Sequence, residues 1–417
     1  MNTHEKTIHR NKYNTKYNTK YNNLNNSHKL TRKNIASDLS MMSGGKFIDR
    51  GGFGCVVSPA LACNYKDKPV DLDKMVSKIL KESTNDVYNE LKISSVLNKL
   101  DPMRKYYITY LKYCPITQIP DDRPDIVSVH YTNEKHSKYT LAAGQRTKTK
   151  DKKVCDVELS MRPLNIILPF AGYSLSKVMK TPIKSSGTRA IMHRLFIENI
   201  KPYFKHLILG LVKMHNNRIV NRDVKQKNIM LNWDKKTNEM EVRYIDFGLS
   251  DFLTSEFCAN LNNISSKGTP YYKAPELVVA YYIRKYISTR SDQYIIRKIT
   301  EDLEHHFRKA IIEINERELL GNLHANISAM YAKIKSIWDT KISSAYFGTD
   351  KNKFNGYVQK ADIYSLGLSI FETLYKYSNI PVRNDSQLYD LLIHMLAFDP
   401  DKRFNGIQCL AHPYFRS

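Results

Sequence analysis

Cysteine is scarce in this sequence, and no two cysteines form a Cys-x-x-Cys pair. The chain of 417 residues has six, all far apart: Cys55, Cys63, Cys114, Cys155, Cys258 and Cys409. Structural zinc sites and disulfide-stapled domains need closely spaced or dense cysteines. We therefore expect free thiols in a reducing compartment, and neither a zinc site nor a disulfide framework.

Long hydrophobic runs are also missing. A membrane-spanning helix needs about 20 consecutive apolar residues, and no stretch of this chain has that character. The N-terminus is too polar for a secretory signal peptide. We therefore predict a soluble, intracellular and cytoplasmic protein that has no membrane partner.

Acidic residues are outnumbered by basic ones, 41 to 65, which gives a formal net charge of +24. Such an excess suits an acidic partner, such as a nucleic acid, a membrane surface or an acidic protein. It also suits a basic solvated surface with no dedicated partner, and we favour that interpretation.

Residues 1–40 form a low-complexity tail in which Lys-Tyr-Asn repeats with a period of four from Lys12. Aliphatic residues are rare there, so little apolar burial offsets the entropy lost on ordering, and we predict disorder. The tail could contact nucleic acid by charge and stacking. The codon bias of an AT-rich genome explains the same composition, and we favour it.

The run Asn221-Arg222-Asp223-Val224-Lys225-Gln226-Lys227-Asn228, followed by Asp246-Phe247-Gly248, carries the chemistry. Phosphoryl transfer from ATP needs a carboxylate that accepts the hydroxyl proton, and an amide and a second carboxylate that hold magnesium. The run resembles the catalytic loop and the magnesium motif of eukaryotic protein kinases.

Motifs earlier in the chain resemble the nucleotide-binding parts of the same family, in the same order. Glycines followed by an aromatic and a valine resemble the glycine-rich loop, although Asp49 stands where its first glycine is usual. A strand over Met75–Leu80 would carry the phosphate-binding lysine, and the following helix its glutamate partner. The resemblance assigns to nucleotide binding Gly51, Phe53, Gly54, Val56, Lys78 and Glu90.

A buried strand over Leu164–Phe170 is predicted to lead into the hinge that binds adenine. Proline at 169 has no backbone N–H, so the resemblance makes the N–H of Ala171 the adenine donor. It also places Met230 beneath the adenine ring.

Motifs later in the chain complete the series. Gly268–Glu276 ends in Ala-Pro-Glu and resembles the substrate-binding end of the activation segment of Ser/Thr kinases. By resemblance, Asp362 would brace the catalytic loop, and Arg403 would pair with Glu276. Residues 280–356 are an insertion with apolar residues at helical spacing. We predict a helical hairpin that serves as structure or docks a partner.

The resemblance implies an α+β, bilobal protein kinase fold over residues 41–416. A small β-rich N-lobe would span about 44–170, and a larger helical C-lobe with the helical insertion about 171–416. The composition of the tail and the insertions resembles kinases of large DNA viruses.

The implied activity is ATP- and Mg²⁺-dependent phosphorylation of serine or threonine in protein substrates. Asp223 would take the hydroxyl proton, and Lys225 would steady the transferred phosphoryl group. Asn228 and Asp246 would hold Mg²⁺, while Lys78 would hold the α- and β-phosphates. Lys227 stands where kinases directed to basic substrates often carry an acid, which favours neutral or acidic substrates.

Two other functions fit parts of the pattern. A catalytically silent pseudokinase scaffold is favoured by Asp49, by the short spacing from Lys78 to Glu90, and by Asn221, which replaces the usual histidine. A small-molecule phosphotransferase of related fold is disfavoured by Ala-Pro-Glu and Arg403.

The pairing of Arg222 with Asp223 predicts regulation. In kinases with this pair, the arginine gains from an anion on the activation segment. We predict that phosphorylation at Ser265 or Ser266 raises activity through Arg222. The alternative is a built-in anion, Asp251 or Glu256.

Overall fold

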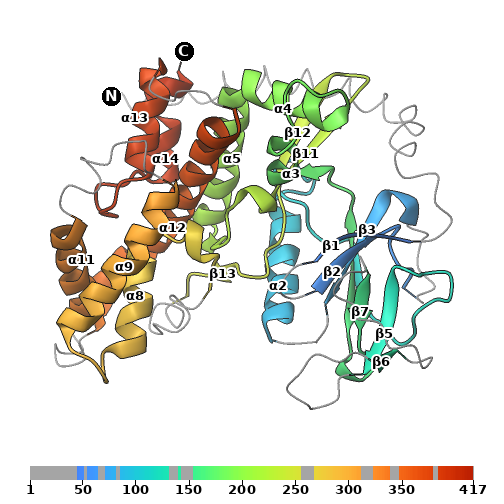
Figure 1. Ribbon diagram of the computed structural model, residues 1–417, viewed down its shortest axis with the longest axis horizontal. Helices are drawn as coiled ribbons and strands as arrows, with labels where there is room; N and C mark the ends of the chain where they lie inside the picture. Colours follow the sequence, from blue (N-terminus) through green and yellow to red (C-terminus); the bar gives the residue numbers. More distant parts are fainter. Residues whose placement is uncertain are drawn as a thin grey trace, which may run out of the picture. The chain divides into compact units, whose positions relative to one another are not determined.

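A computed structural model describes most of the chain (Figure 1). The described residues are 45–50, 54–63, 71–80, 85–130, 140–141, 154–254, 267–310, 323–338, 347–378 and 384–416. Expectations for the tail, and for Gly51, Phe53, Ser265 and Ser266, lie outside them. The chain divides into two compact units. The sheet unit comprises the described residues of Met1–Glu82 with Lys112–Phe170, and the helical unit comprises Ser83–Leu111 with Ala171–Ser417.

The sheet unit is built on a five-stranded antiparallel sheet in the order β1-β2-β3-β8-β4. Its inner strands are rich in Val, Ile and Leu, as expected for positions that pack on both sides. A smaller sheet, β6-β5-β7, packs its apolar residues with those of β2 in one core. The strand bounds are β1 Lys46–Arg50, β2 Gly54–Ser58, β3 Met75–Leu80, β4 Lys112–Pro115, β5 Ile126–His130, β6 Thr140–Leu141, β7 Cys155–Val157 and β8 Leu164–Pro169.

Four cysteines of the sheet unit form disulfides, so the prediction of free thiols was wrong for them. Cys55 on β2 is bonded to Cys155 on β7, and Cys63 is bonded to Cys114 on β4, with Cα atoms 5.8 and 5.9 Å apart. The partners are 100 and 51 residues apart in sequence. Strand pairing, which spacing does not reveal, brings them together. Cys409 is a buried free thiol.

The helical unit surrounds one large hydrophobic core, to which α5 and α12 contribute buried side chains. Helix α12 is buried along most of its described length, so it has apolar residues all round instead of a single stripe. The bounds are α2 Asn85–Leu100, α3 Leu175–Met179, α4 Thr188–Glu198, α5 Ile200–Asn216, α8 Pro275–Tyr286, α9 Asp292–Ala310, α11 Leu323–Trp338, α12 Phe347–Glu372, α13 Ser386–Met395 and α14 Gly406–Leu410.

Short strands near the start of the helical unit position the candidate site. Strands β11 and β12 form a hairpin, β9 pairs with β11, and β10 pairs with β13. Their bounds are β9 Tyr173–Ser174, β10 Ile219–Val220, β11 Ile229–Asp234, β12 Glu239–Tyr244 and β13 Asp251–Phe252.

The described part of the insertion is helical, as predicted. Helices α9 and α11 run beside α8 (Figure 1). Of the apolar residues on which the prediction rested, Ile299 and Leu303 on α9 and Ile327, Met330 and Ile334 on α11 are buried, and Ile296 is partly buried. The insertion therefore extends the core of the helical unit.

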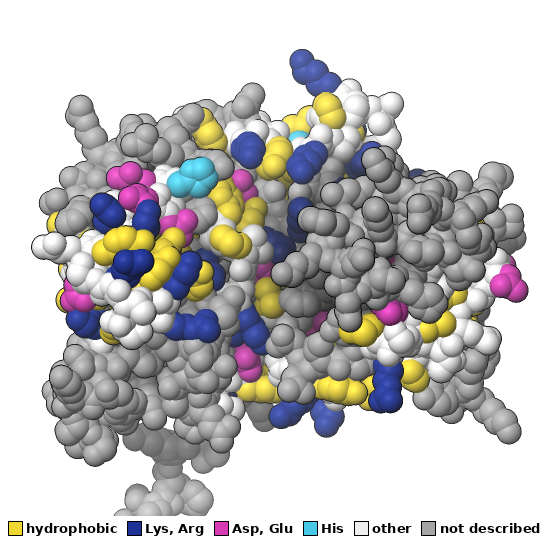
Figure 2. All heavy atoms as spheres, turned by 60° about the horizontal axis from the view of Figure 1, so that its bottom comes forward, with side chains coloured by type: hydrophobic (Ala, Val, Ile, Leu, Met, Phe, Trp, Pro, Cys, Tyr) yellow, Lys and Arg dark blue, Asp and Glu magenta, His cyan; other side chains and the backbone are white. Residues whose placement is uncertain are grey.

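Among the described residues, no helix combines the length and hydrophobicity needed to cross a bilayer. Figure 2 shows Lys and Arg side chains spread over the described part of one face, interspersed with hydrophobic ones. On the described part of this face the positive charge is spread out and not gathered in a single patch.

Candidate active site

Helix α12 holds the catalytic loop, residues 221–228, through one buried carboxylate. Asp362 accepts hydrogen bonds from the backbone N–H of Asn221 (2.8 Å) and of Arg222 (2.7 Å). The ring of His215, at the end of α5, lies 3.0 Å from the same carboxylate. A buried carboxylate is stable only when such donors surround it, so Asp362 fixes the backbone just before Asp223.

Asp223 is 5% exposed and lies at the centre of a polar cluster. Its carboxylate accepts from the Lys225 ammonium (2.7 Å), the Asn228 amide (2.9 Å) and the Thr269 hydroxyl (2.6 Å). The Lys225 ammonium also lies 2.8 Å from the Thr269 oxygen. Asp223, Lys225 and Asn228, the three residues that the sequence predicts to be catalytic, thus lie in one cluster together with Thr269.

Asn221, which replaces the usual histidine, contributes a contact that sequence reasoning missed. Its side-chain oxygen accepts the backbone N–H of Asp223 at 3.1 Å, and the residue is 1% exposed. Among the described residues its amide nitrogen has no hydrogen-bond partner. Asparagine at this position therefore adds a hydrogen bond that fixes the backbone of Asp223, and leaves its own buried amide N–H group unsatisfied.

Asn228 and Asp246 flank the hairpin formed by β11 and β12. The register pairs Ile229 with Tyr244, and the Ile245 N–H donates to the Asn228 carbonyl at 3.0 Å. Asp246 has a φ of +64°, a left-handed backbone conformation that is uncommon for a non-glycine residue and often marks a functional site.

This pair fits a magnesium ion. The Asn228 amide nitrogen donates to both the carbonyl and the carboxylate of Asp223, which leaves its carbonyl oxygen for a cation. With the Asp246 carboxylate it supplies two hard oxygen ligands. No group of three or more His, Cys, Asp or Glu among the described residues could hold a metal by itself. Magnesium takes few protein ligands and completes its shell with phosphates and water.

Helix α2 packs beside the Asp246 turn. A Cβ atom on Gly248 would lie 3.1 Å from a Glu90 oxygen and 3.5 Å from an Asp246 oxygen. The Asn89 side chain donates to the Ser250 carbonyl at 2.9 Å. Glu90, 9% exposed, is therefore held against the turn that carries Asp246.

In the sheet unit, Lys78 lies in the middle of β3, opposite Val56 of β2 and Ile166 of β8. A side chain on Gly54 would overlap the Ile79 carbonyl, because the ideal Cβ position is 1.9 Å from that oxygen. Gly54 thus permits the close approach of β2 to β3 just after the predicted glycine-rich loop.

The predicted hinge residues Ala171 and Gly172 lie beside β11. Ala171 is buried, and Gly172 has a φ of +84°. A Cβ atom on Gly172 would lie 2.0 Å from the Leu231 carbonyl oxygen, so only glycine fits. Met230 pairs with Ser174 across β9 and β11, which places it in the strand next to this turn.

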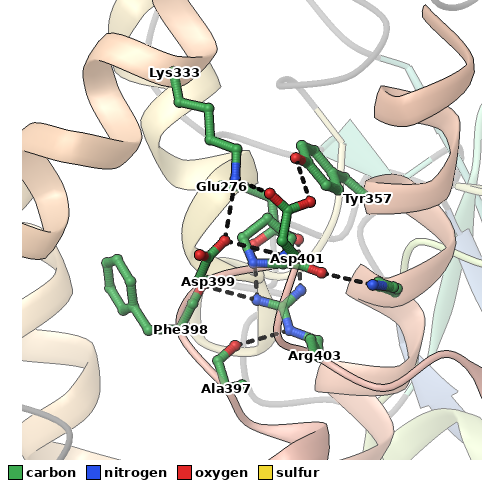
Figure 3. Close-up of polar contacts among 10 residues, drawn as sticks. Glu276, Lys333, Tyr357, Ala397, Phe398, Asp399, Asp401 and Arg403 are labelled. Atoms are coloured by element: carbon green, nitrogen blue, oxygen red, sulfur yellow. Dashed lines mark hydrogen bonds and ion pairs between the residues drawn. The ribbon is translucent and has the colours of Figure 1, made fainter. Parts of the chain in front are cut away.

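Glu276 and Arg403 form a buried ion pair with two parallel hydrogen bonds of 2.6 and 2.9 Å, and both side chains are 0% exposed. In Figure 3 the Arg403 guanidinium also donates to the carbonyl of Ala397, at 3.0 Å. Planar two-point pairing of this kind is the strong form of a charged hydrogen bond. It anchors the C-terminal end of the activation segment.

The insertion reaches the same anchor. The Lys333 ammonium of α11 bonds to Asp399 (3.2 Å) and Asp401, in the loop before Arg403, and the Tyr357 hydroxyl donates to Asp401 at 2.7 Å (Figure 3). The predicted hairpin is thus tied by charge to the segment that carries Arg403.

The region beside Arg222 is strongly basic. A guanidinium nitrogen of Arg222 lies 3.6 Å from the Asp251 carboxylate, and the Lys267 ammonium lies 4.0 Å from it. Burial, followed by the charge of Arg222, lowers the pKa of Lys273 to about 8. Asp251, the alternative anion considered from the sequence, therefore lies beside Arg222.

Tyr271 and Tyr272 of the activation segment both donate to Glu372 at the end of α12, at 3.0 and 2.7 Å. Burial and the Glu372 carboxylate raise the pKa of both phenols. One carboxylate thus satisfies two half-buried hydroxyls and fixes the segment just after Thr269.

Similarity to known proteins agrees with this geometry. Residues 174–307 match the protein kinase domain. The chain has the α+β protein kinase fold. Cyclin-dependent kinase E-1 of Arabidopsis thaliana is 26% identical over 273 residues, which are 63% of this chain and 53% of that protein. Mitogen-activated protein kinase kinase kinase 3 of Arabidopsis thaliana is 41% identical over 78 residues, 18% of this chain and 11% of that protein.

The chain thus spans about half the length of the first of these relatives and less of the second. Over these segments the chain is similar to eukaryotic-type protein kinases.

Proposed function

We propose that this protein transfers the γ-phosphoryl group of ATP, with magnesium, to serine and threonine hydroxyls of protein substrates. The observation that carries the proposal is the cluster at Asp223, where a nearly buried carboxylate holds a lysine ammonium and a hydroxyl within 2.7 Å. A carboxylate in contact with an alcohol and a cation is the arrangement that phosphoryl transfer to an alcohol needs.

The residues of the helical unit divide the work. Asp223 orients the substrate hydroxyl and accepts its proton. Lys225 stabilises negative charge on the phosphoryl group as it is transferred. Asn228 and Asp246 would hold magnesium, which neutralises the phosphates when bound. Asp362 and Asn221 fix the backbone of Asp223, so the carboxylate is oriented before substrate arrives.

The sheet unit would supply the phosphate contacts. We assign contacts with the α- and β-phosphates to Lys78, and the phosphate loop to Gly51, Phe53, Gly54 and Val56. The adenine would bind the N–H of Ala171 above Met230. These assignments rest on the order of the motifs and on the kinase fold.

Preference for serine and threonine is supported by Thr269. Its hydroxyl rests between Asp223 and Lys225, so the site already accommodates an aliphatic alcohol. Origin in a large DNA virus and a cytoplasmic location stay predictions that rest on composition.

The test is transfer of labelled phosphate from ATP to a peptide array with magnesium. We expect phosphoserine and phosphothreonine products, and kcat lower by about 10²-fold or more in Asp223→Ala, Asp246→Ala and Lys78→Ala. Asp234→Ala, at the far end of β11, is the matched control and should retain activity.

The competing function is a pseudokinase scaffold. It predicts no transfer by the wild-type protein above the level of Asp223→Ala, even with saturating ATP and magnesium. Dominant phosphotyrosine would instead overturn the choice of acceptor.

A further inference from the structure

A pocket of about 440 Å³ opens beside the candidate active site. Its lining comes from the end of α3, the catalytic loop, the activation segment and the end of α12. Lys225 and Thr269, both bonded to Asp223, belong to this lining. A substrate side chain that enters the pocket would therefore lie within a few residues, along the substrate chain, of an acceptor hydroxyl bound at Asp223.

The pocket is lined by four lysines and one carboxylate. Lys180, Lys227 and Lys376 are exposed, and Lys225 is partly buried against Asp223. Among the described residues, neither Lys180 nor Lys227 has a carboxylate within ion-pair distance. Two ammonium groups thus face the pocket without a compensating acid, and the site is positive where substrate would enter.

The single carboxylate of the lining, Glu372, is already engaged. It is buried, accepts both tyrosine hydroxyls, and has the Lys376 ammonium 4.0 Å from one oxygen. A basic substrate residue would have to displace these donors and would meet Lys180 and Lys227 on its way. An anionic substrate residue would be attracted by the lysines of the lining.

We propose that this pocket selects protein substrates that carry an anionic side chain, carboxylate or phosphoryl, close to the acceptor hydroxyl. Lys180 and Lys227 are its specificity-determining residues, and Lys376 contributes charge at the rim. This inference rests on the proposed kinase function and deepens it by naming the substrate class.

The experiment compares kcat/KM of the full-length protein for matched peptides. Each peptide has one serine acceptor in an alanine background, with glutamate, phosphothreonine or lysine placed at each flanking position in turn. We expect glutamate or phosphothreonine to raise kcat/KM about tenfold over alanine at the best position, and lysine there to lower it. Comparison of the glutamate peptides with the phosphothreonine peptides shows whether the pocket prefers a carboxylate or a phosphoryl group.

Charge reversal then locates the effect. In Lys180→Glu/Lys227→Glu the anionic preference, measured as the ratio of kcat/KM for the anionic peptide to kcat/KM for the all-alanine peptide, should vanish or invert. Lys235→Glu/Lys236→Glu, on the exposed turn between β11 and β12, has the same change in charge and should keep the wild-type preference.

Each outcome has a distinct meaning. A flat profile, a preference for lysine, or an anionic preference that survives the Lys180/Lys227 reversal overturns the inference and leaves the kinase function intact. No transfer to any peptide overturns both. If the Lys235/Lys236 control loses the anionic preference equally, the overall positive charge of the protein causes the preference. That result would also overturn the assignment to this pocket.

Discussion

The cluster around Asp223 and the anchor between Glu276 and Arg403 lie at the two ends of one segment, Thr269–Glu276. Both are made of carboxylates and cations. The anchor is fully buried, and its two partners satisfy each other. At Asp223 the carboxylate is shared among a lysine, an amide and a hydroxyl, and Lys225 stays partly exposed.

The comparison indicates that the degree of burial decides whether a charged cluster has a structural role or can take part in chemistry. An ion pair with no exposed surface cannot exchange partners without unfolding its surroundings, so it serves stability and register. A carboxylate with several partners, two of which line a pocket, can release one and accept another. Four changes would break or sharpen this contrast.

The largest effect should come from Arg403→Ala, which leaves Glu276 buried without its partner. We expect the free energy of unfolding to fall by about 3–5 kcal/mol in urea denaturation. The double variant Glu276→Leu/Arg403→Met removes both charges and should lose much less. Equal losses in the two variants would mean that packing, and not the stranded charge, sets the cost.

Thr269→Val should act on catalysis with little change in stability. It removes the hydroxyl that joins Asp223 to Lys225, and hydrogen bonds to charged groups contribute about 1.5–3 kcal/mol. We expect kcat to fall about tenfold to a hundredfold, and Thr269→Ser to retain most activity. A Thr269→Ser protein as slow as Thr269→Val would show that the hydroxyl alone does not account for the effect.

Lys273 lies between the two clusters, and its ammonium is destabilised by burial and then by Arg222. Its pKa is about 8 when folded and about 10.5 when unfolded. Between these values the unfolded chain binds more protons, so stability rises with pH and the increase ends near pH 10.5. Relative to Lys273→Met, the wild-type protein should gain about 2 kcal/mol across this window in denaturant titrations. A constant difference would show that Lys273 stays charged.

Asp251 should have the smallest effect of the four. Its carboxylate lies beside Arg222 and Lys267, so Asp251→Asn leaves two cations less compensated next to the catalytic loop. We expect kcat to fall about tenfold. The Ser265→Ala/Ser266→Ala variant, with mass spectrometry of the active protein, tests the phosphate alternative. A loss in that variant, and none in Asp251→Asn, would establish the phosphate as the ordering anion.

Residues that do chemistry at fixed spacing could be predicted from the sequence. Asp223 and Lys225 lie together in one short loop, and Glu276 pairs with Arg403, because motif order specifies their elements. The helices of the insertion followed from apolar periodicity.

Contacts that depend on tertiary register could not be predicted. The bond between Cys55 and Cys155 needs β2 and β7 to lie together, and nothing local in either strand signals that. The hold of Asn221 on the Asp223 N–H depends on one side-chain orientation inside a buried loop. The bonds from Lys333 to Asp399 and Asp401 depend on where α11 docks.

The Thr269 hydroxyl, 2.6 Å from Asp223, also affects whether water can accept the phosphoryl group in place of the substrate hydroxyl. With that alcohol on one carboxylate oxygen, and with Lys225 and Asn228 on the other, a water molecule would find the base already engaged. A tethered protein substrate reaches the site at high effective concentration, and water has no such advantage. Under the proposed function, Thr269 would thus suppress wasteful ATP hydrolysis between encounters with substrate.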